Sequence, residues 1–199
     1  MMGRRGRRGQ RGQSLVEFTL ILPTLLLLVL GTAEMGLALN TSMSLVEATR
    51  EGARVGAALS NGASTIIGCA SGSTNVDPQI IESVQRVVES PGNGIKRLNI
   101  DWIRIFKSDS GGNEVSTNEW RPTVSPGGGP SICGVALDFK LFGTENWPAS
   151  SRSTTLPVVS LGVKIQYHYT LVTPLNAIFK VFGGGQITMT DQTVMALEP

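Results

Sequence analysis

The run from Leu15 to Ala33, nineteen residues of which only Glu17 is charged, constrains this chain more than any other feature. About 20 apolar residues of helix cross the hydrocarbon core of a bilayer, so the run has the length of a membrane span. It is longer than the roughly 7–15 apolar residues of a secretory signal. No small-x-small cleavage site closes it, because Glu34 and Met35 follow without a break in the helical pattern. We therefore expect one membrane-spanning helix.

Five arginines precede this run within the first twelve residues, and no acidic residue accompanies them. The rest of the chain carries twelve basic against fifteen acidic groups, a net charge of −3, which predicts no broad positive surface for nucleic acid. The arginines suit a nucleic-acid arm, a solvated tail, a twin-arginine export signal or a cytoplasmic topology signal. Their place directly before an apolar run favours the topology signal. The N-terminus is then cytoplasmic, and the C-terminal part lies outside the cytoplasmic (inner) membrane.

Two residues inside the apolar run need their own explanation. Glu17 lies near the cytoplasmic edge, where an unpaired carboxylate costs about 2–4 kcal/mol. Either its side chain reaches the lipid headgroups, or it meets a cation supplied by another protein. Pro23 removes one backbone hydrogen bond, and we expect a local break or kink there, which membranes tolerate.

The apolar run and its flanks resemble the N-terminus of TadE-like pseudopilins, minor components of the tight-adherence (Tad/Flp) type IV pilus system, through the segment RGQSLVEFTLILPTLLLLVLGTAEMGLALN. The resemblance covers residues 3–60 and, more weakly, the last forty. It implies that an aspartic prepilin peptidase cuts after Gly12, which makes Gln13 the first residue of the mature chain. Glu17 and Phe18 would then be the fifth and sixth residues. In this family the glutamate is thought to pair with the new N-terminal amine of a neighbouring subunit.

The same resemblance implies the partners: prepilin peptidase, other pilin or pseudopilin subunits, the inner-membrane assembly platform and membrane lipid. A carboxylate set against an ammonium in low dielectric would fix the register between subunits, even if its net stabilisation is modest. The function implied is structural, in the assembly of a Tad-type pilus or related secretion apparatus, without catalysis. The alternatives are an unprocessed membrane-anchored scaffold or binding module, and an anchored enzyme whose site lies in the unmatched middle of the chain.

Helical periodicity continues beyond the apolar run. We expect one helix from about Ser14 to about Leu59, ended by Ser60-Asn61-Gly62. Ala48, Gly52 and Gly56 fall four apart on one stripe, and such small residues let another backbone or a sheet approach closely. The stripe can dock on the chain's own domain, on other subunits, or on both.

Three parts are expected: a basic cytoplasmic leader (1–12), a transmembrane and amphipathic helix (13–60), and an extracytoplasmic domain (61–199). In that domain we expect a helix with Asp77 as its N-cap and Pro78 at its first position. Its apolar face would hold Ile80, Ile81, Val84, Val87 and Val88, and the residues Pro91-Gly92-Asn93-Gly94 would end it.

Alternating and β-branched residues predict strands in four segments: 98–106, 134–142, 158–172 and 186–197. In the first, the alternation slips between Trp102 and Ile103, which indicates a bulge. Polar residues at 108–130 predict a long exposed loop, and 175–182 an apolar turn. The fold class expected is pilin-like α+β: a long N-terminal transmembrane helix, continuing into a helix packed on a small antiparallel sheet.

Residues that carry catalysis or bind metal are sparse. His168 is the only histidine, on the polar face of a strand with no ligand companion nearby, so a solvated or tyrosine-flanked side chain is expected. No phosphate-loop or nucleophile-elbow motif is present. We expect no cofactor and no metal. Cys69 and Cys133 are the only cysteines, and an oxidising compartment favours a disulfide between them over two free thiols.

Overall fold

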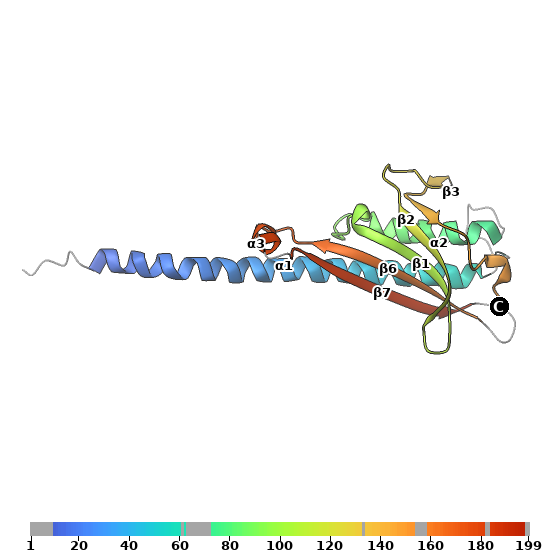
Figure 1. Ribbon diagram of the computed structural model, residues 1–199, viewed down its shortest axis with the longest axis horizontal. Helices are drawn as coiled ribbons and strands as arrows, with labels where there is room; N and C mark the ends of the chain where they lie inside the picture. Colours follow the sequence, from blue (N-terminus) through green and yellow to red (C-terminus); the bar gives the residue numbers. More distant parts are fainter. Residues whose placement is uncertain are drawn as a thin grey trace, which may run out of the picture. The chain divides into compact units, whose positions relative to one another are not determined.

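The structure is a computed structural model that describes residues 10–60, 62, 73–132, 134–153, 159–181 and 184–197, without the side chains of 10–12, 73 and 178. It divides the chain into two compact units. The first unites residues 1–37 with 170–185, and the second unites 38–169 with 186–199. The fold class is α+β, as predicted, with a long helix followed by a second helix and an antiparallel sheet (Figure 1). The predicted division into leader, helix and domain stays a prediction.

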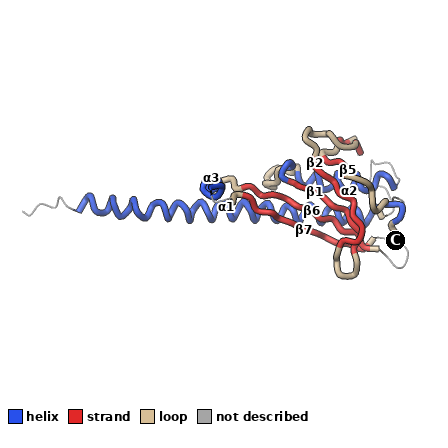
Figure 2. The backbone as a smooth tube through the Cα atoms, in the orientation of Figure 1, coloured by secondary structure: helices blue, strands red, loops and turns tan. Residues whose placement is uncertain are grey.

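The first helix, α1, runs from Gln10 to Leu59 as one uninterrupted element (Figure 2). The helix continues through Pro23, so the predicted break is wrong, whereas the predicted kink stays a prediction. A proline removes a single N–H donor, and the rest of the hydrogen-bond ladder is sufficient here. The predicted C-terminal end is confirmed: Ser60 has a φ of 51°, and Gly62 N donates to the Leu59 carbonyl.

The main sheet has five strands in the order β5-β2-β1-β6-β7. Their bounds are β1 Ile100–Ser108, β2 Glu114–Pro122, β5 Phe139–Phe142, β6 Ser160–Thr170 and β7 Gln186–Ala196. The strand β1 pairs antiparallel with both β2 and β6, and β2 pairs antiparallel with β5. A separate two-stranded ribbon joins β3 (Ser131–Ile132) to β4 (Val135–Ala136).

The helix α2 (Val76–Val88) and the second half of α1 form the core of the second unit together with β6. Glycines make the close approach possible. A Cβ built on Gly52 would lie 2.7 Å from Val84 of α2 and 3.3 Å from Val163 of β6. A Cβ on Gly56 would lie 2.8 Å from Leu161 of β6. Figure 1 shows strands of the sheet crossing in front of both helices.

The predicted alternation of β6 is confirmed, because Leu161, Val163, Ile165, Tyr167 and Tyr169 are all buried. The closing strand is also confirmed as β7. Its Asp191 is bound to α1: Thr49 Oγ1 donates to Asp191 Oδ2 at 2.5 Å and lies 3.0 Å from Thr193 Oγ1.

The helix α2 starts differently from the prediction. Asn75 is the N-cap, without a side-chain cap bond, and Asp77 lies inside the helix. The Asp77 carboxylate instead accepts from Arg152 Nη2 at 2.5 Å and from Asn118 Nδ2 at 2.7 Å. Arg152 is only 2% exposed, so its charge has to be paired, and it takes the carboxylate that would otherwise cap the helix. The apolar face and the end of α2 are as predicted, with Val87 half-buried.

The exposed loop predicted at 108–130 is wrong in its middle, where β2 runs from Glu114 to Pro122, whereas residues 123–130 form a largely exposed loop. Only residues 109–113 form the turn between β1 and β2. Trp120 of β2 is buried, and Asn118 is fully buried. The Asn118 amide oxygen accepts from the backbone N–H groups of Asn146 and Trp147, both at 2.9 Å. A strand of polar residues is therefore stabilised by partners that are distant in the sequence.

The other differences are local. The strand predicted at 134–142 is divided into β4 and β5, because Leu137 between them exchanges backbone hydrogen bonds with Gly129 and Pro130. Asp138, next to Leu137, is buried and pairs with Arg97 Nε at 2.8 Å. The bulge in β1 is present between Ile100 and Trp102, one step earlier than predicted.

The apolar turn predicted at 175–182 is the helix α3, Leu175–Val181. Three short 3-10 helices complete the described elements: Ser73–Asn75, Arg97–Asn99 and Ala149–Ser151.

Candidate functional site: the exposed half of the N-terminal helix

The apolar run of α1 is exposed in the structure. Of its large apolar side chains, Leu22 and Leu30 are half-buried, and the exposed fractions of the others range from 48% at Leu26 to 73% at Leu20. Among the described residues, this is the one helix that is long and apolar enough to cross a membrane. Its most apolar stretch has a mean hydropathy of 2.1, and none of that stretch is buried. Exposing so much apolar surface to water is unfavourable, so this surface requires a lipid or protein environment.

Two of the three threonine hydroxyls in the run are hydrogen-bonded within the helix. Thr19 Oγ1 donates to the Leu15 carbonyl at 2.7 Å, and Thr32 Oγ1 donates to the Val29 carbonyl at 2.9 Å. Hydroxyls bonded in this way present no unpaired donor to the surroundings, which is the condition for placing them in hydrocarbon. The run is therefore compatible with a bilayer despite these hydroxyls.

Glu17 and Phe18 lie at the start of the run, and both are exposed. Glu17 Oε1 accepts one hydrogen bond, from Gln13 Nε2 at 3.0 Å. No ion pair to Glu17 is found within the part of the chain that the structure describes. The predicted cut between Gly12 and Gln13 falls in the first turn of α1. Cleavage and pairing of Glu17 with a second subunit stay predictions.

The predicted packing stripe has a clear place in the fold. Ala48 is fully buried, and Gly52 and Gly56 lie against α2 and β6 of the same chain. In the structure these residues are docked on the chain's own domain, and docking on other subunits stays a prediction. Gly31 and Gly36, by contrast, have no atom within 4 Å of a built Cβ.

Sequence reasoning missed the role of Glu34. Its side chain is 5% exposed, and its two carboxylate oxygens accept from the backbone N–H groups of Val172 and Thr173, each at 2.9 Å. The carboxylate follows directly on the apolar run, which was the available signal. Its partners are backbone groups 138 and 139 residues away, so no side-chain pattern indicates them.

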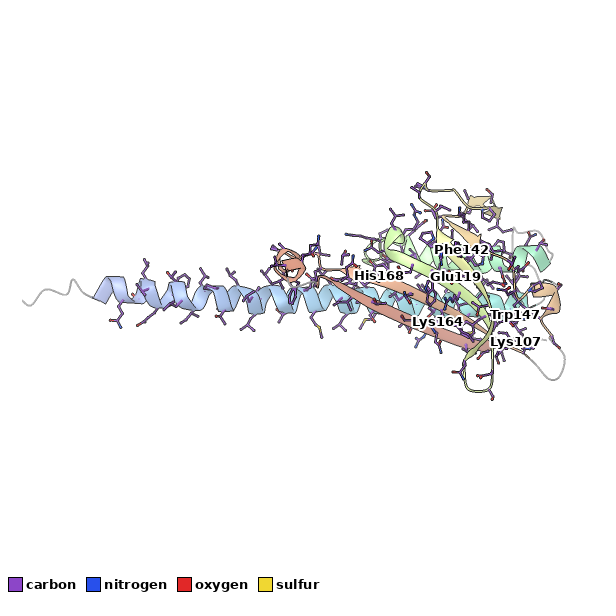
Figure 3. All side chains as sticks on the ribbon, in the orientation of Figure 1. Lys107, Glu119, Phe142, Trp147, Lys164 and His168 are labelled. Atoms are coloured by element: carbon purple, nitrogen blue, oxygen red, sulfur yellow. The ribbon has the colours of Figure 1, made fainter. Side chains whose placement is uncertain are left out.

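Charged side chains on the polar face of the sheet form ion pairs with one another, and Figure 3 labels three of them, Glu119, Lys164 and His168. His168, expected to be solvated or flanked by tyrosine, lies between Tyr167 and Tyr169 and is half-buried, with its Nδ1 2.7 Å from Asp101 Oδ1. Lys164 binds Glu114 at 2.9 Å, and Glu119 binds both Arg104 and Arg121. Burial works to raise the pKa of Glu119, but its hydrogen bonds to Arg121 and Arg104 outweigh burial and hold the pKa below its ordinary value.

Two observations bear on the enzyme alternative. A pocket beside Trp120 has a volume of about 130 Å³, and Asp77 and Glu145 are among its lining residues. That volume is below the roughly 300–1,000 Å³ typical of ligand sites. A larger, open hollow of about 680 Å³ lies along the second half of α1, next to Val87 and Met195. Within the described ranges, no three His, Cys, Asp or Glu side chains gather as metal ligands. Burial, and then the charge of Asp77, raise the pKa of Glu145.

Cys69 and Cys133 lie outside the described residues, so the disulfide stays a prediction.

Comparison with known proteins supports the N-terminal resemblance. The family model for TadE-like proteins matches residues 12–54, a range that begins at the predicted cleavage glycine and covers most of α1. No curated protein and no solved structure matches the chain. The match suggests a role in the Tad pilus system. The predicted resemblance to TadE-like proteins is thus confirmed for the N-terminal helix, over residues 12–54.

Proposed function

We propose that this chain is a minor pilin-like subunit that takes part in the assembly of a Tad-type pilus or related secretion apparatus, and that it catalyses no reaction. In this proposal residues 1–12 form a cytoplasmic leader, the apolar half of α1 crosses the inner membrane, and the domain lies outside. One observation carries the proposal: the TadE-like segment is a continuous helix whose apolar half is exposed, with a carboxylate at its start.

The charge at Glu17 gives the proposal its mechanism. Cleavage after Gly12 by prepilin peptidase would create an α-amine on Gln13, four residues before Glu17. Within one helix the side chains of residues four apart are neighbours, and Gln13 already reaches Glu17 in this way. In a filament the amine of one subunit would instead meet Glu17 of its neighbour. Neutralising both charges in hydrocarbon would fix the axial register of the subunits.

Mass spectrometry of the mature N-terminus tests processing. In cells that express the peptidase, the chain is expected to begin at Gln13. Replacing Gly12 with a bulky residue such as leucine is expected to leave the leader attached, because the peptidase pattern requires glycine there. If all of the wild-type protein retains its leader, the chain is an unprocessed membrane-anchored scaffold or binding module.

Glu17→Ala tests assembly separately from processing. The variant is expected to be cut normally after Gly12 but to enter the assembly poorly, since the amine of a neighbour no longer finds a carboxylate. Glu47→Ala is the matched control, because Glu47 is an exposed glutamate on the same helix but lies beyond the apolar run. Assembly measured by pilus recovery and by co-isolation of other subunits would be equal in the two variants if Glu17 has no such role.

A further inference from the structure

The segment 170–185 forms a compact excursion within the first unit. Its base is closed where Leu171 N donates to the Gly185 carbonyl at 3.3 Å. Between these residues lies α3, whose end is turned back by the hydrogen bond from Gly184 N to the Phe179 carbonyl at 2.9 Å. Leu175 is buried, so the segment has an inward side of its own.

Glu34 places this excursion along α1. The run from Leu15 to Ala33 is about 28 Å long as a helix, close to the roughly 30 Å of bilayer hydrocarbon. Glu34 is the next residue, so it lies at one boundary of the hydrocarbon layer if the run crosses a membrane. Its hydrogen bonds to Val172 N and Thr173 N hold the start of the excursion at that same depth.

The side chains that this excursion exposes match a membrane interface. Val172, Phe179 and Val181 have exposed fractions of 62%, 47% and 80%. Lys180 is also exposed, and it is the only charged residue from 170 to 185. Aromatic and aliphatic side chains partition into the headgroup region, and a lysine extends its ammonium to the phosphates. In water the same apolar surface would be unfavourable.

We propose that residues 172–181 are a second membrane contact, in which Val172, Phe179 and Val181 insert at the interface of the leaflet next to Glu34 and Lys180 binds lipid phosphate. The proposal rests on the membrane anchoring given under the proposed function. Lipid is the occupant because the exposed surface continues from a span of bilayer length and is held at its boundary. The excursion then limits how far α1 can slide along the membrane normal.

Quenching by brominated lipids tests this contact. The full chain is placed in vesicles of phosphatidylcholine and phosphatidylglycerol brominated either near the headgroups or near the bilayer centre. Phe179→Trp is compared with Leu26→Trp in the span and with Val124→Trp, a 91% exposed position outside this unit. The signal is the quenching in excess of the wild type, which subtracts the three native tryptophans.

We expect Phe179→Trp to be quenched more by the shallow bromines, Leu26→Trp more by the deep bromines, and Val124→Trp by neither. If Leu26→Trp is quenched and Phe179→Trp matches Val124→Trp, the excursion lies away from lipid while the anchoring holds. Blue-shifted but unquenched emission from Phe179→Trp would mean that protein covers it, and this outcome also overturns the proposal. If Leu26→Trp is not quenched, the anchoring itself fails.

Two further variants make the result independent of one substitution. Val181→Trp is expected to repeat the shallow quenching, because Val181 is the most exposed of the three apolar side chains. Lys180→Glu in the Phe179→Trp background is expected to reduce the shallow quenching by about twofold or more in vesicles rich in phosphatidylglycerol, because a carboxylate is repelled by anionic headgroups. Equal quenching with lysine and glutamate would remove the phosphate contact from the proposal.

Discussion

The two halves of α1 have opposite surroundings although they belong to one helix. Near the N-terminal end most of the large apolar side chains are about half or more exposed, and Gly31 has open space around it. In the second half Leu45, Ala48 and Ala53 are buried, and Gly52 and Gly56 lie against side chains of α2 and β6. The difference teaches that helix periodicity alone does not define function here. What a residue contacts depends on which half of the helix carries it.

Overpacking the second half should have the largest effect. Gly56→Leu is expected to destabilise the full chain in detergent by about 3 kcal/mol or more, because a built Cβ already lies 2.8 Å from Leu161 and 2.9 Å from Ile80. Gly36→Leu, with nothing within 4 Å, is the control and should change stability by less than about 0.5 kcal/mol. Thermal unfolding followed by near-UV circular dichroism measures both. Equal losses would show that the contrast between the halves is not one of packing.

Two threonines of α1 provide a smaller test. Thr49→Val removes a hydroxyl that is fully buried and bonded to Asp191, and is expected to cost about 1–2 kcal/mol, since that bond is to a charged group. Thr32→Val removes only the bond to the Val29 carbonyl of the same helix, and is expected to be neutral within about 0.5 kcal/mol. Chemical unfolding of the two variants is the measurement. A loss in Thr32→Val as large as in Thr49→Val would contradict the comparison.

Glu34 lies between the exposed and the buried half of α1, and replacing it should change only the segment that it contacts. In Glu34→Ala, the N–H groups of Val172 and Thr173 lose the carboxylate that accepts both bonds. Hydrogen exchange at these two amides is expected to accelerate about tenfold or more, with little change in the melting temperature. Glu47→Ala should leave the exchange of both amides unchanged. Slow exchange in Glu34→Ala would mean that other groups protect this segment.

The smallest change in the free energy of unfolding is expected at Glu119, which has two arginine partners. Glu17, which has no basic partner among the described residues, is the comparison. The folded-state pKa of Glu119 is lowered, so its ionised form contributes stability that is fully present above the unfolded pKa and is lost as pH falls through the folded value. Glu119→Gln is expected to cost up to about 1 kcal/mol at pH 7, and this cost should shrink as the pH falls below the ordinary glutamate pKa of about 4.3 and through the lower folded-state pKa. Glu17→Gln, which removes no ion pair within the described residues, should cost less than about 0.5 kcal/mol at pH 7. Unfolding curves at several pH values distinguish the two.

Sequence reasoning succeeded where a pattern is contained in one segment. The apolar run, the end of α1 at Leu59 and the alternation of β6 each depend on neighbouring residues, and the structure has all three. The TadE-like resemblance also lies within one continuous stretch. Local patterns were therefore sufficient for the fold class and for recognising the N-terminal segment.

Prediction from the sequence failed where a polar residue has its hydrogen-bond or ion-pair partner far along the chain. Asp77 has the pattern of a helix cap, but Arg152, 75 residues later, takes its carboxylate. The strand β2 reads as a loop because Asn118 and Glu119 are satisfied by residues that only folding brings close. Glu34 was missed for the same reason, since backbone N–H groups carry no sequence signal.

The close packing of Gly52 and Gly56 against α2 and β6 limits how far the chain can be truncated from its N-terminus. A soluble fragment made by deleting the apolar run must still begin near Ala38, because removing the second half of α1 would uncover Ile80, Val84, Leu161 and Val163 at once. Even that fragment loses Glu34, so its residues 172 and 173 would need water in place of the carboxylate. The apolar run and the domain therefore cannot be separated by a cut at the C-terminal end of α1. A usable fragment boundary exists only inside α1.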